Sequence, residues 1–378
     1  MLYLDSAATT RPRPEVVELV AEFLRSPAGN PSSVHPAGML KRKQLQEARE
    51  QLALLLGVPL EGVTFTSGGT ESINLAIKGV LFNRGKIKGQ LVTSPLEHKA
   101  VTETASWFES LGGKVEWVRI DPKTGQVDQN HLSELVGPQT GLVSIQQVNS
   151  ETGIIQDLPG VAKIIKTKNP ACWFHVDGVQ GFGKLPLALR ETGIDLYSIS
   201  GHKIGGLTGA GALIQTQRIA LEAQLSGGGQ EGGRRAGTEN LVSILALAKA
   251  AQLTFSERLA NGSQVENWGR TFIAALSNEL PVQLAGSDAV RSPYLFTLLF
   301  DKILGEVLLH HLAQKGIYLS QGSACQARSK QLSPSLKALG LKDEQIRSSL
   351  RISLAPAELT HSPIEVAQQF IEVIKKLG

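Results

Sequence analysis

The sequence predicts an α/β protein in which a large domain with a mostly parallel sheet, flanked by helices, is joined to a smaller α+β domain. Short runs rich in β-branched and aromatic residues alternate with longer helical patterns through the middle of the chain, as is typical of parallel sheets. Past about Ala250 this alternation stops, and helical segments flank fewer strands. We therefore expect a large domain over residues 15–250 and a small domain made of residues 1–14 and 251–378.

The expected elements follow in order along the chain, most of them bounded by Gly, Pro or Asn. EGVTFTSG predicts a strand that enters a glycine-rich turn, and TESINLAIKGVLF predicts the helix after it. The other strands expected in the large domain are GQLVTSPLEH, KVEWVRI, TGLVSIQQVN, CWFHVDG, DLYSISGHK and GALIQ. Those expected in the small domain are PYLFTLLF, GIYLS and LRISLA. The glycine-rich loop from Gly227 to Asn240 is either a hinge or a binding loop, and its Arg and Thr content favours binding.

Composition and charge exclude several classes of protein. Of the 378 residues, 42% are hydrophobic and 19% are charged, and the net charge of +4 is spread without a block of like charges. Two cysteines allow one disulfide at most, which favours a reducing compartment. The start MLYLDSAATT lacks the features of a signal peptide, and no apolar run is long enough to span a membrane. We expect a cytoplasmic protein that binds neither membranes nor nucleic acid.

Lys203 and Asp177 each stand at the end of an expected strand. Lys203 follows DLYSISGH, and Asp177 ends FHVD with Gln180 three residues later. Because ligands of open α/β sheets bind at the carboxyl ends of the strands, we expect both side chains at one edge of the sheet. A lysine amine and a carboxylate there suit pyridoxal 5'-phosphate: the amine bonds to the aldehyde carbon, and the carboxylate pairs with the protonated ring nitrogen. A lysine at this place alone would indicate only solvated surface.

Two further features fit the same cofactor. FTSGGTES places Gly68, Gly69 and Thr70 at a strand-to-helix turn, where backbone N–H groups and the helix dipole favour a phosphate. SPLEHKAV ends another strand at His98, whose flat ring can stack on a pyridine face. Taken separately, these features would indicate a capped helix and an ordinary histidine. Together and in this order they form a specific pattern.

With these motifs the chain resembles the pyridoxal-phosphate-dependent cysteine desulfurases of the NifS/IscS type, which are class-V aminotransferases of fold type I. The resemblance extends almost from end to end of the chain. It is carried by YLDSAATT, GNPSSVH, FTSGGTESINLAIKG, EHKAV, VNSETGIIQD, HVDGVQGFGKLP, SISGHKIGG, GGGQEGGRRAGTEN, GSAC and LRISLA.

The resemblance implies a homodimer with active sites at the subunit interface. It implies that Ser200 and His202 contact the cofactor phosphate beside Thr238, which the neighbouring subunit supplies from the glycine-rich loop. It also implies a protein that accepts the sulfur, and an iron–sulfur scaffold or a tRNA-thiolation enzyme would fit equally well.

The family's nucleophile is the cysteine of a GSAC motif, and Cys325 has this position. The implied reaction converts L-cysteine to L-alanine. Lys203 removes the substrate α-proton, and the Cys325 thiolate then attacks the substrate sulfur and keeps it as a persulfide for the acceptor. His98 can also shuttle protons. Arg351 matches the family's arginine for the substrate carboxylate, and Asn30 resembles a second carboxylate contact, although an ordinary Asn-Pro turn is the other interpretation.

The sequence departs from the family pattern in two places. Asn149 is followed by Ser150, where many members carry a second asparagine near the cofactor's phenolic oxygen. A serine hydroxyl reaches less far, so we expect Gln180 to share that role. The stretch from Cys325 to Pro334 is also longer than in many members and contains two basic residues.

Other functions fit these residues less well. An aminotransferase on the same scaffold has no use for the thiol, whereas a selenocysteine lyase would share every feature and stays an alternative. GGLTGAGA resembles a dinucleotide-binding glycine motif but leads into a strand, not a helix. His310 and His311 are adjacent and cannot share a helix face, so we expect no metal site. A non-catalytic scaffold would be expected to have lost part of the residue set, and Cys172 is interpreted as a small core residue.

Overall fold

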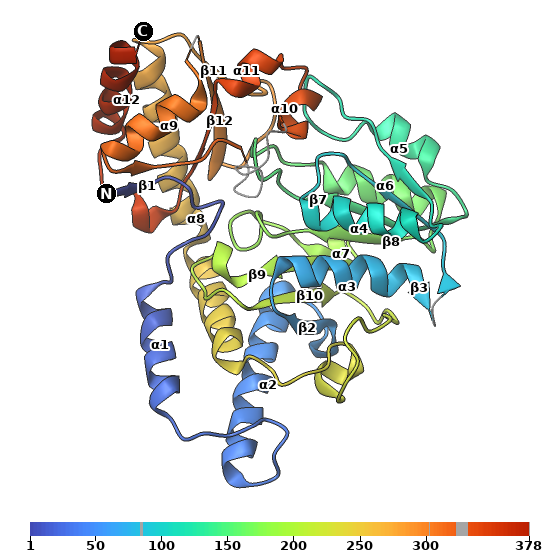
Figure 1. Cartoon of the computed structure of the whole chain (residues 1–378). Helices are drawn as coiled ribbons and strands as arrows, with labels where there is room; N and C mark the ends of the chain where they lie inside the picture. The colour runs from blue at the N-terminus through green and yellow to red at the C-terminus, as the bar shows by residue number, and fades with distance from the viewer. Residues whose placement is uncertain (84–85, 302, 323–331, 378) are drawn as a thin grey trace.

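A seven-stranded sheet forms the centre of the larger part of the molecule (Figure 1). The computed structural model describes residues 1–83, 86–301, 303–322 and 332–377. Across the sheet, the strands are β2 (Val63–Thr66), β10 (Gly211–Gln215), β9 (Leu196–Ser200), β8 (Trp173–Asp177), β7 (Thr140–Gln146), β5 (Gln90–Thr93) and β6 (Val115–Trp117). β10 runs antiparallel to both of its neighbours, β2 and β9, and the other pairs of adjacent strands in this sheet are parallel. The predicted α/β fold with a mostly parallel sheet is confirmed.

Helices cover both faces of this sheet, and each face has its own apolar core. On one face α3 (Gly69–Leu81) and α4 (Lys99–Ser110) pack against strand residues such as Leu142 and Leu213. On the other face α2 (Pro36–Leu56), α6 (Leu158–Lys168) and the first part of α8 (Leu241–Ser277) contribute to a core with strand residues such as Val143 and Ile199. Burial of both faces explains why nearly all residues of the central strands are buried, small polar ones such as Thr64 and Ser198 included.

The smaller part of the molecule contains a three-stranded antiparallel sheet. Its strands are β11 (Val282–Leu284), β12 (Leu295–Phe300) and β14 (Ser349–Ser353), in that order. Next to it β1 (Leu2–Tyr3) pairs in parallel with β13 (Ile317–Tyr318), so the N-terminal strand joins the C-terminal part of the chain. The second part of α8 packs here with α9 (Gly305–Gln314) and α12 (Pro363–Leu377).

One helix runs through both parts. Early residues of α8 such as Leu247 belong to the core of the large sheet, whereas Trp268 and Phe272 belong to the core of the small one. The predicted division after residue 250 therefore falls inside this helix. That division stays a prediction.

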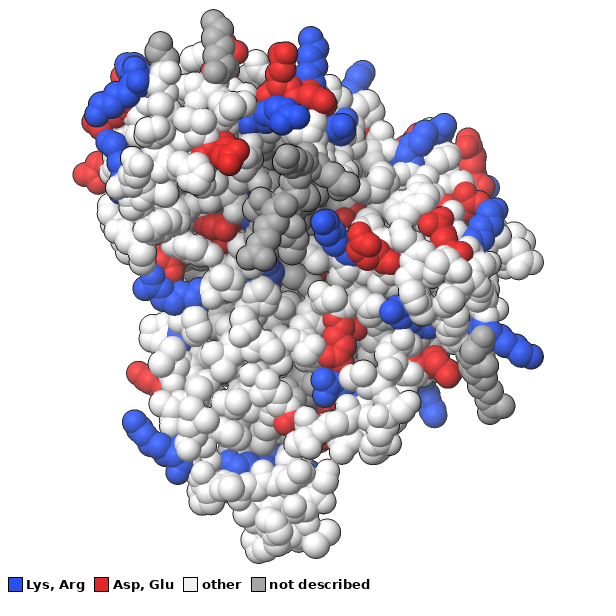
Figure 2. Space-filling view, in the orientation of Figure 1, with Lys and Arg blue, Asp and Glu red and all other residues white. Residues whose placement is uncertain are grey.

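The remaining elements lie at the periphery or in connections. They are α1 (Pro14–Arg25), β3 (Phe82–Asn83), β4 (Lys86–Ile87), α5 (Gln129–Leu135), α7 (Leu189–Thr192), α10 (Pro334–Ala338) and α11 (Asp343–Arg347). On the face drawn in Figure 2, acidic and basic side chains are intermixed. Within the residues that the structure describes, every helix is too short or too polar to reach across a bilayer.

Candidate active site

The carboxyl ends of the central strands bring His98, Asp177 and Lys203 together. Asp177 is the last residue of β8, and Lys203 ends a short 3-10 turn directly after β9. His98 caps the N-terminus of α4, and its Nδ1 accepts a hydrogen bond from the Ala100 N–H at 3.0 Å. The three groups are close enough for the charges of Asp177 and Lys203 to act on the pKa of His98. Residues separated by more than a hundred positions thus form one cluster, as their places at strand ends predicted.

Burial sets the charge states in this cluster. It lowers the pKa of the His98 imidazole despite the nearby Asp177 carboxylate, so the ring is neutral at neutral pH. Burial raises the pKa of the Asp177 carboxyl, which is partly offset by His98, by the Val179 N–H that donates to Oδ1 at 3.0 Å, and by Lys203. A cationic partner beside Asp177 would therefore be bound strongly, because it would remove most of this desolvation cost.

The N-terminal segment crosses the site and contacts three of the predicted residues. Lys203 Nζ donates to the carbonyls of Ala7 at 2.6 Å and Ala8 at 2.7 Å. Gln180 Nε2 donates to the same Ala7 carbonyl at 3.0 Å. His202 Nδ1 lies 3.1 Å from Thr9 Oγ1, and burial lowers the pKa of its ring to about 4. The sequence suggested no contact between this segment and the lysine turn.

The first turn of α3 has the features of an anion site. Gly68 caps it with φ 157° and without a side-chain hydrogen bond, so the first N–H groups of the helix have no side chain competing for them at that position. A Cβ on Gly69 would lie 2.7 Å from Val179 Cγ2 and 3.7 Å from Ser200 Cβ. Gly69 is therefore packed against the Asp177 turn and the end of β9, where only glycine leaves room. Thr70 is exposed on the same turn.

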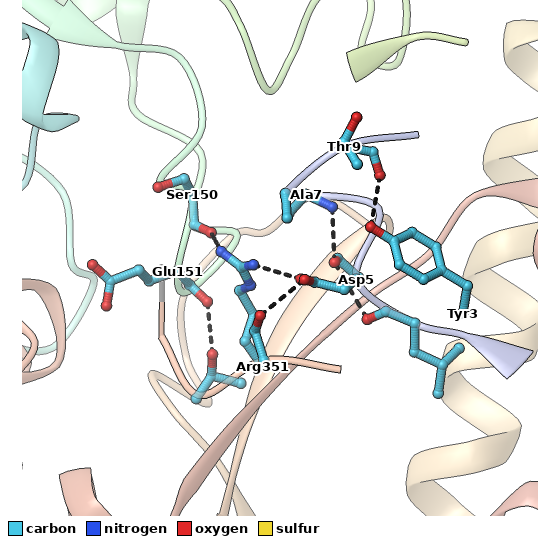
Figure 3. Close-up of polar contacts among 12 residues, drawn as sticks. Tyr3, Asp5, Ala7, Thr9, Ser150, Glu151 and Arg351 are labelled. Atoms are coloured by element: carbon cyan, nitrogen blue, oxygen red, sulfur yellow. Dashed lines mark hydrogen bonds and ion pairs between the residues drawn. The ribbon is translucent and has the colours of Figure 1, made fainter. Parts of the chain in front are cut away.

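Arg351 lies buried on β14 and faces the large sheet. Its guanidinium donates to Asp5 Oδ1 at 2.6 Å through Nη2 and to the Ser150 carbonyl at 3.0 Å through Nη1 (Figure 3). Within the described residues, its buried Nε group has no hydrogen-bond partner. A buried guanidinium with an unused N–H is suited to bind a further carboxylate. The Asp5 partner was missed by the sequence analysis.

Asn149 and Ser150 follow the end of β7. The Asn149 side chain is fully buried and engaged with the protein: Oδ1 accepts the N–H groups of Glu151 and Thr152 at 3.0 and 2.8 Å, and Nδ2 donates to the Leu96 carbonyl at 3.1 Å. Asn149 therefore shapes the turn that presents Ser150 and Glu151 to Arg351.

Three comparisons with known proteins agree. Residues 2–362 match the aminotransferase class-V family model. The chain is 37% identical to the cysteine desulfurase IscS of Methanosarcina thermophila over its whole length and 92% of that protein. A NifS-like protein of known structure superposes with a TM-score of 0.92 at 32% identity, covering 99% of both chains. A structure described as SspA in complex with cysteine has a TM-score of 0.83 at 31% identity, covering 94% of this chain and 99% of that one.

This chain belongs to the class-V aminotransferase family.

Proteins of this family carry pyridoxal 5'-phosphate, and the residues present here suit it. The glycine turn before α3 leaves backbone N–H groups for the phosphate, and the buried Asp177 carboxylate suits the ring nitrogen. Lys203 is close enough to Asp177 and His98 for its charge to act on the pKa of both, as a lysine bonded to the same cofactor must be. The cofactor expected from the sequence is confirmed by the family.

Two of the predicted residues lie away from this cluster within one chain. The loop between α1 and α2 lies at the bottom of Figure 1. Asn30 is exposed in this loop, and its Oδ1 accepts the Ser32 N–H at 2.9 Å. Thr238 is exposed on the glycine-rich loop. Pro31 and Ser32 line a cavity of about 300 Å³ together with that loop. The loops of Asn30 and Thr238 are thus neighbours.

The two cysteines differ. Cys172 is buried, and burial raises the pKa of its thiol to about 12, in agreement with its interpretation as a core residue. Cys325 lies outside the described residues.

Two further titratable groups near the site were missed. Desolvation and the Lys203 charge lower the pKa of Lys184 to about 7. Burial raises the pKa of the Glu97 carboxyl well above its usual range, and its Oε1 accepts the Gln146 N–H at 2.9 Å. Lys184 is the lysine of GKLP and Glu97 is the glutamate of EHKAV. Membership of these two motifs was the only indication in the sequence.

Proposed function

We propose that this protein is a pyridoxal-phosphate-dependent cysteine desulfurase. It converts L-cysteine to L-alanine and transfers the sulfur, as a persulfide on Cys325, to an acceptor. The observation that carries the proposal is the cluster of Lys203, Asp177 and His98 at the strand ends, with Arg351 of the small sheet bonded to the Ser150 carbonyl in the turn after β7. Relatives over the full length are named cysteine desulfurases, and the GSAC motif adds the thiol.

When bound, pyridoxal phosphate withdraws electrons from the substrate α-carbon. Lys203 holds the cofactor and, once released, carries the α-proton, while Asp177 keeps the ring nitrogen protonated. The neutral imidazole of His98 would stack on the ring and can pass protons at neutral pH. Ser150, on the turn that the Asn149 side chain shapes, and Gln180 would hold the ring's oxygen side.

The cofactor phosphate is bound by groups from both subunits of a homodimer in this proposal. Gly69 and Thr70 present the N-terminus of α3, and Ser200 and His202 follow β9. Thr238 comes from the neighbouring subunit.

Arg351 binds the substrate carboxylate, with Asn30 as the second contact. The similar protein named SspA was solved with cysteine, which supports this substrate. The Cys325 thiolate attacks the substrate sulfur, the C–S bond breaks, and the electron pair left on carbon is protonated on the way to L-alanine. Cys325 belongs to the small domain, residues 1–14 and 251–378, and the sulfur acceptor is a protein such as an iron–sulfur scaffold or a tRNA-thiolation enzyme. The cytoplasmic location expected from the cysteine content stays a prediction.

The test starts with the absorption spectrum of the purified protein. L-cysteine and a reductant are then added, and sulfide and alanine are measured for wild type, Cys325→Ala and, as a matched control, Cys172→Ala. We expect a yellow protein that releases both products, a yellow but inactive Cys325→Ala, and an active Cys172→Ala. A colourless protein would refute the cofactor assignment. Equal alanine formation without Cys325 would refute the persulfide route, and a strong preference for selenocysteine would favour a selenocysteine lyase.

A further inference from the structure

Two carboxyl groups lie beside the buried guanidinium of Arg351. Asp5 pairs with it directly, at 2.6 Å (Figure 3). Glu151 follows Ser150, whose carbonyl accepts from Arg351, and the charge of Arg351 acts on the Glu151 carboxyl. Burial nevertheless raises the pKa of Glu151, so this group retains its proton to a higher pH than an ordinary glutamate. The cluster therefore contains one ion pair and one carboxyl group with a raised pKa.

Each carboxyl group also holds a serine that borders the segment with Cys325. Ser320 Oγ donates to Asp5 Oδ2 at 2.9 Å. Ser333 Oγ donates to Glu151 Oε2 in a short hydrogen bond. Ser320 precedes Cys325 by five residues in the sequence and Ser333 follows it by eight, so a described residue on each side of Cys325 is bonded to a group that contacts or influences Arg351.

Ser320 and Glu151, which hold the two sides of the Cys325 segment, make further hydrogen bonds. The Ser320 and Arg351 backbones pair, with the Arg351 N–H donating to the Ser320 carbonyl at 2.8 Å. The Glu151 carbonyl accepts from Thr297 Oγ1 at 2.6 Å, and Thr297 lies opposite Arg351 in the β12–β14 ladder. Glu151 and Ser333 are both buried, and a buried polar group that loses its partner costs about 1–3 kcal/mol. These contacts are therefore not exchanged freely for water.

We propose that Asp5 and Glu151 are positioning residues that fix both ends of the Cys325 segment relative to Arg351. The proposal rests on the function proposed above. Arg351 binds the substrate carboxylate. The carboxyl groups around Arg351 set the distance from that bound carboxylate to the two anchors, Ser320 and Ser333. Sulfur transfer depends on this distance, because reacting atoms must come within about 3–3.5 Å of each other.

Ser333→Ala tests the proposal, because it removes one anchor hydroxyl and leaves Arg351 and Asp5 unchanged. The same hydroxyl caps α10 by accepting the Leu336 N–H at 3.1 Å, so the α-proton exchange below also checks that the site stays intact. In a single turnover with L-cysteine, we expect persulfide formation on Cys325, followed by mass spectrometry, to fall about 10- to 100-fold. The KM for L-cysteine should change less than about twofold, because Arg351 still binds the carboxylate. Exchange of the L-alanine α-proton in D2O requires Lys203 but no thiol, and should stay at the wild-type rate.

A second measurement uses the cofactor-free protein. Iodoacetamide should modify Cys325 alone, since Cys172 is buried and its pKa is raised to about 12. We expect Ser333→Ala to increase the alkylation rate of Cys325 at least about threefold, because one anchor of the segment is lost. The matched control is Ser348→Ala, which also removes a serine hydroxyl from this part of the molecule, here one bonded to the Glu344 carbonyl at 2.9 Å. The control should behave like wild type in every assay.

Glu151→Gln adds a conservative variant. A neutral amide has nearly the shape of a protonated carboxyl and can still accept from Ser333, so this variant should stay within about threefold of wild type in persulfide formation. Persulfide formation at the wild-type rate in Ser333→Ala would overturn the proposal. A parallel loss of α-proton exchange would also overturn it, because the effect would then be a general one on the site. Wild-type protein that forms no persulfide would refute the proposed function itself.

Discussion

The pair formed by Arg49 and Glu231 should be a main determinant of stability in the large domain. Glu231 lies on the glycine-rich loop, and its side chain is 1% exposed. Its two oxygens accept from Arg49 Nη1 and Nη2 at 2.9 and 2.7 Å, and Oε2 also accepts the Phe65 N–H at 2.8 Å. Glu231 has φ 50°, a left-handed conformation that only such contacts would maintain in a glutamate.

Replacing Glu231 by Ala leaves a guanidinium that is 13% exposed without its counter-ion. Breaking one side of a buried pair costs about 3–5 kcal/mol. Within that loss, the unpaired Phe65 N–H accounts for about 1–3 kcal/mol. The double variant Arg49→Met with Glu231→Leu removes both charges. It leaves the Phe65 N–H and the Val63 carbonyl, which accepts from Arg49 Nη1 at 2.6 Å, without these partners, but no unpaired charge, so it should be more stable than either single variant.

The assay is urea unfolding of the cofactor-free protein at one fixed protein concentration, followed by tryptophan fluorescence. Glu50→Ala, next to Arg49 on α2 but exposed, is the matched control and should change the free energy of unfolding by less than about 0.5 kcal/mol. Additive losses in the double variant would refute the reasoning, since they would show that the two side chains do not act as a pair. The cofactor affinity of Glu231→Ala should also fall, because Thr238 is on the same loop.

Three further outcomes are expected. Gly69→Val should abolish cofactor binding, measured by absorbance, because even a Cβ at this position would lie 2.7 Å from Val179 Cγ2; retained yellow colour would contradict this. Cys172→Ser should unfold at lower urea concentration than wild type but keep its alanine-forming activity, because the thiol is buried and unused. His175 is buried and neutral, with a pKa lowered to about 3 by burial. Below pH 6.5 the unfolded chain therefore takes up a proton that the folded chain does not, and stability should fall with pH down to about 3. Urea midpoints at pH 7.5 and 5.0 should differ less for His175→Gln, and an unchanged difference would show that other groups cause the loss.

Much of the fold follows from local patterns. The strands from Val63 to Gln215 appear as short runs rich in β-branched and aromatic residues, and the helix from Gly69 begins where a strand meets a glycine turn. The extent of α8 was not predicted. One helix supplies two different cores, so its apolar pattern changes partway, and the Asn261–Gly262 pair near the change is typical of a turn, not of a helix interior.

The sequence by itself determined which groups stand at strand ends, and therefore the cluster of His98, Asp177 and Lys203. Position along a parallel strand suffices for this, because all such strands end at one edge of the sheet. Only the tertiary structure decided what surrounds Arg351. Asp5 lies 346 residues from it in sequence, and they meet because β1 joins the C-terminal part of the chain. Such a contact depends on how separate elements pack, and no local pattern of residues encodes it.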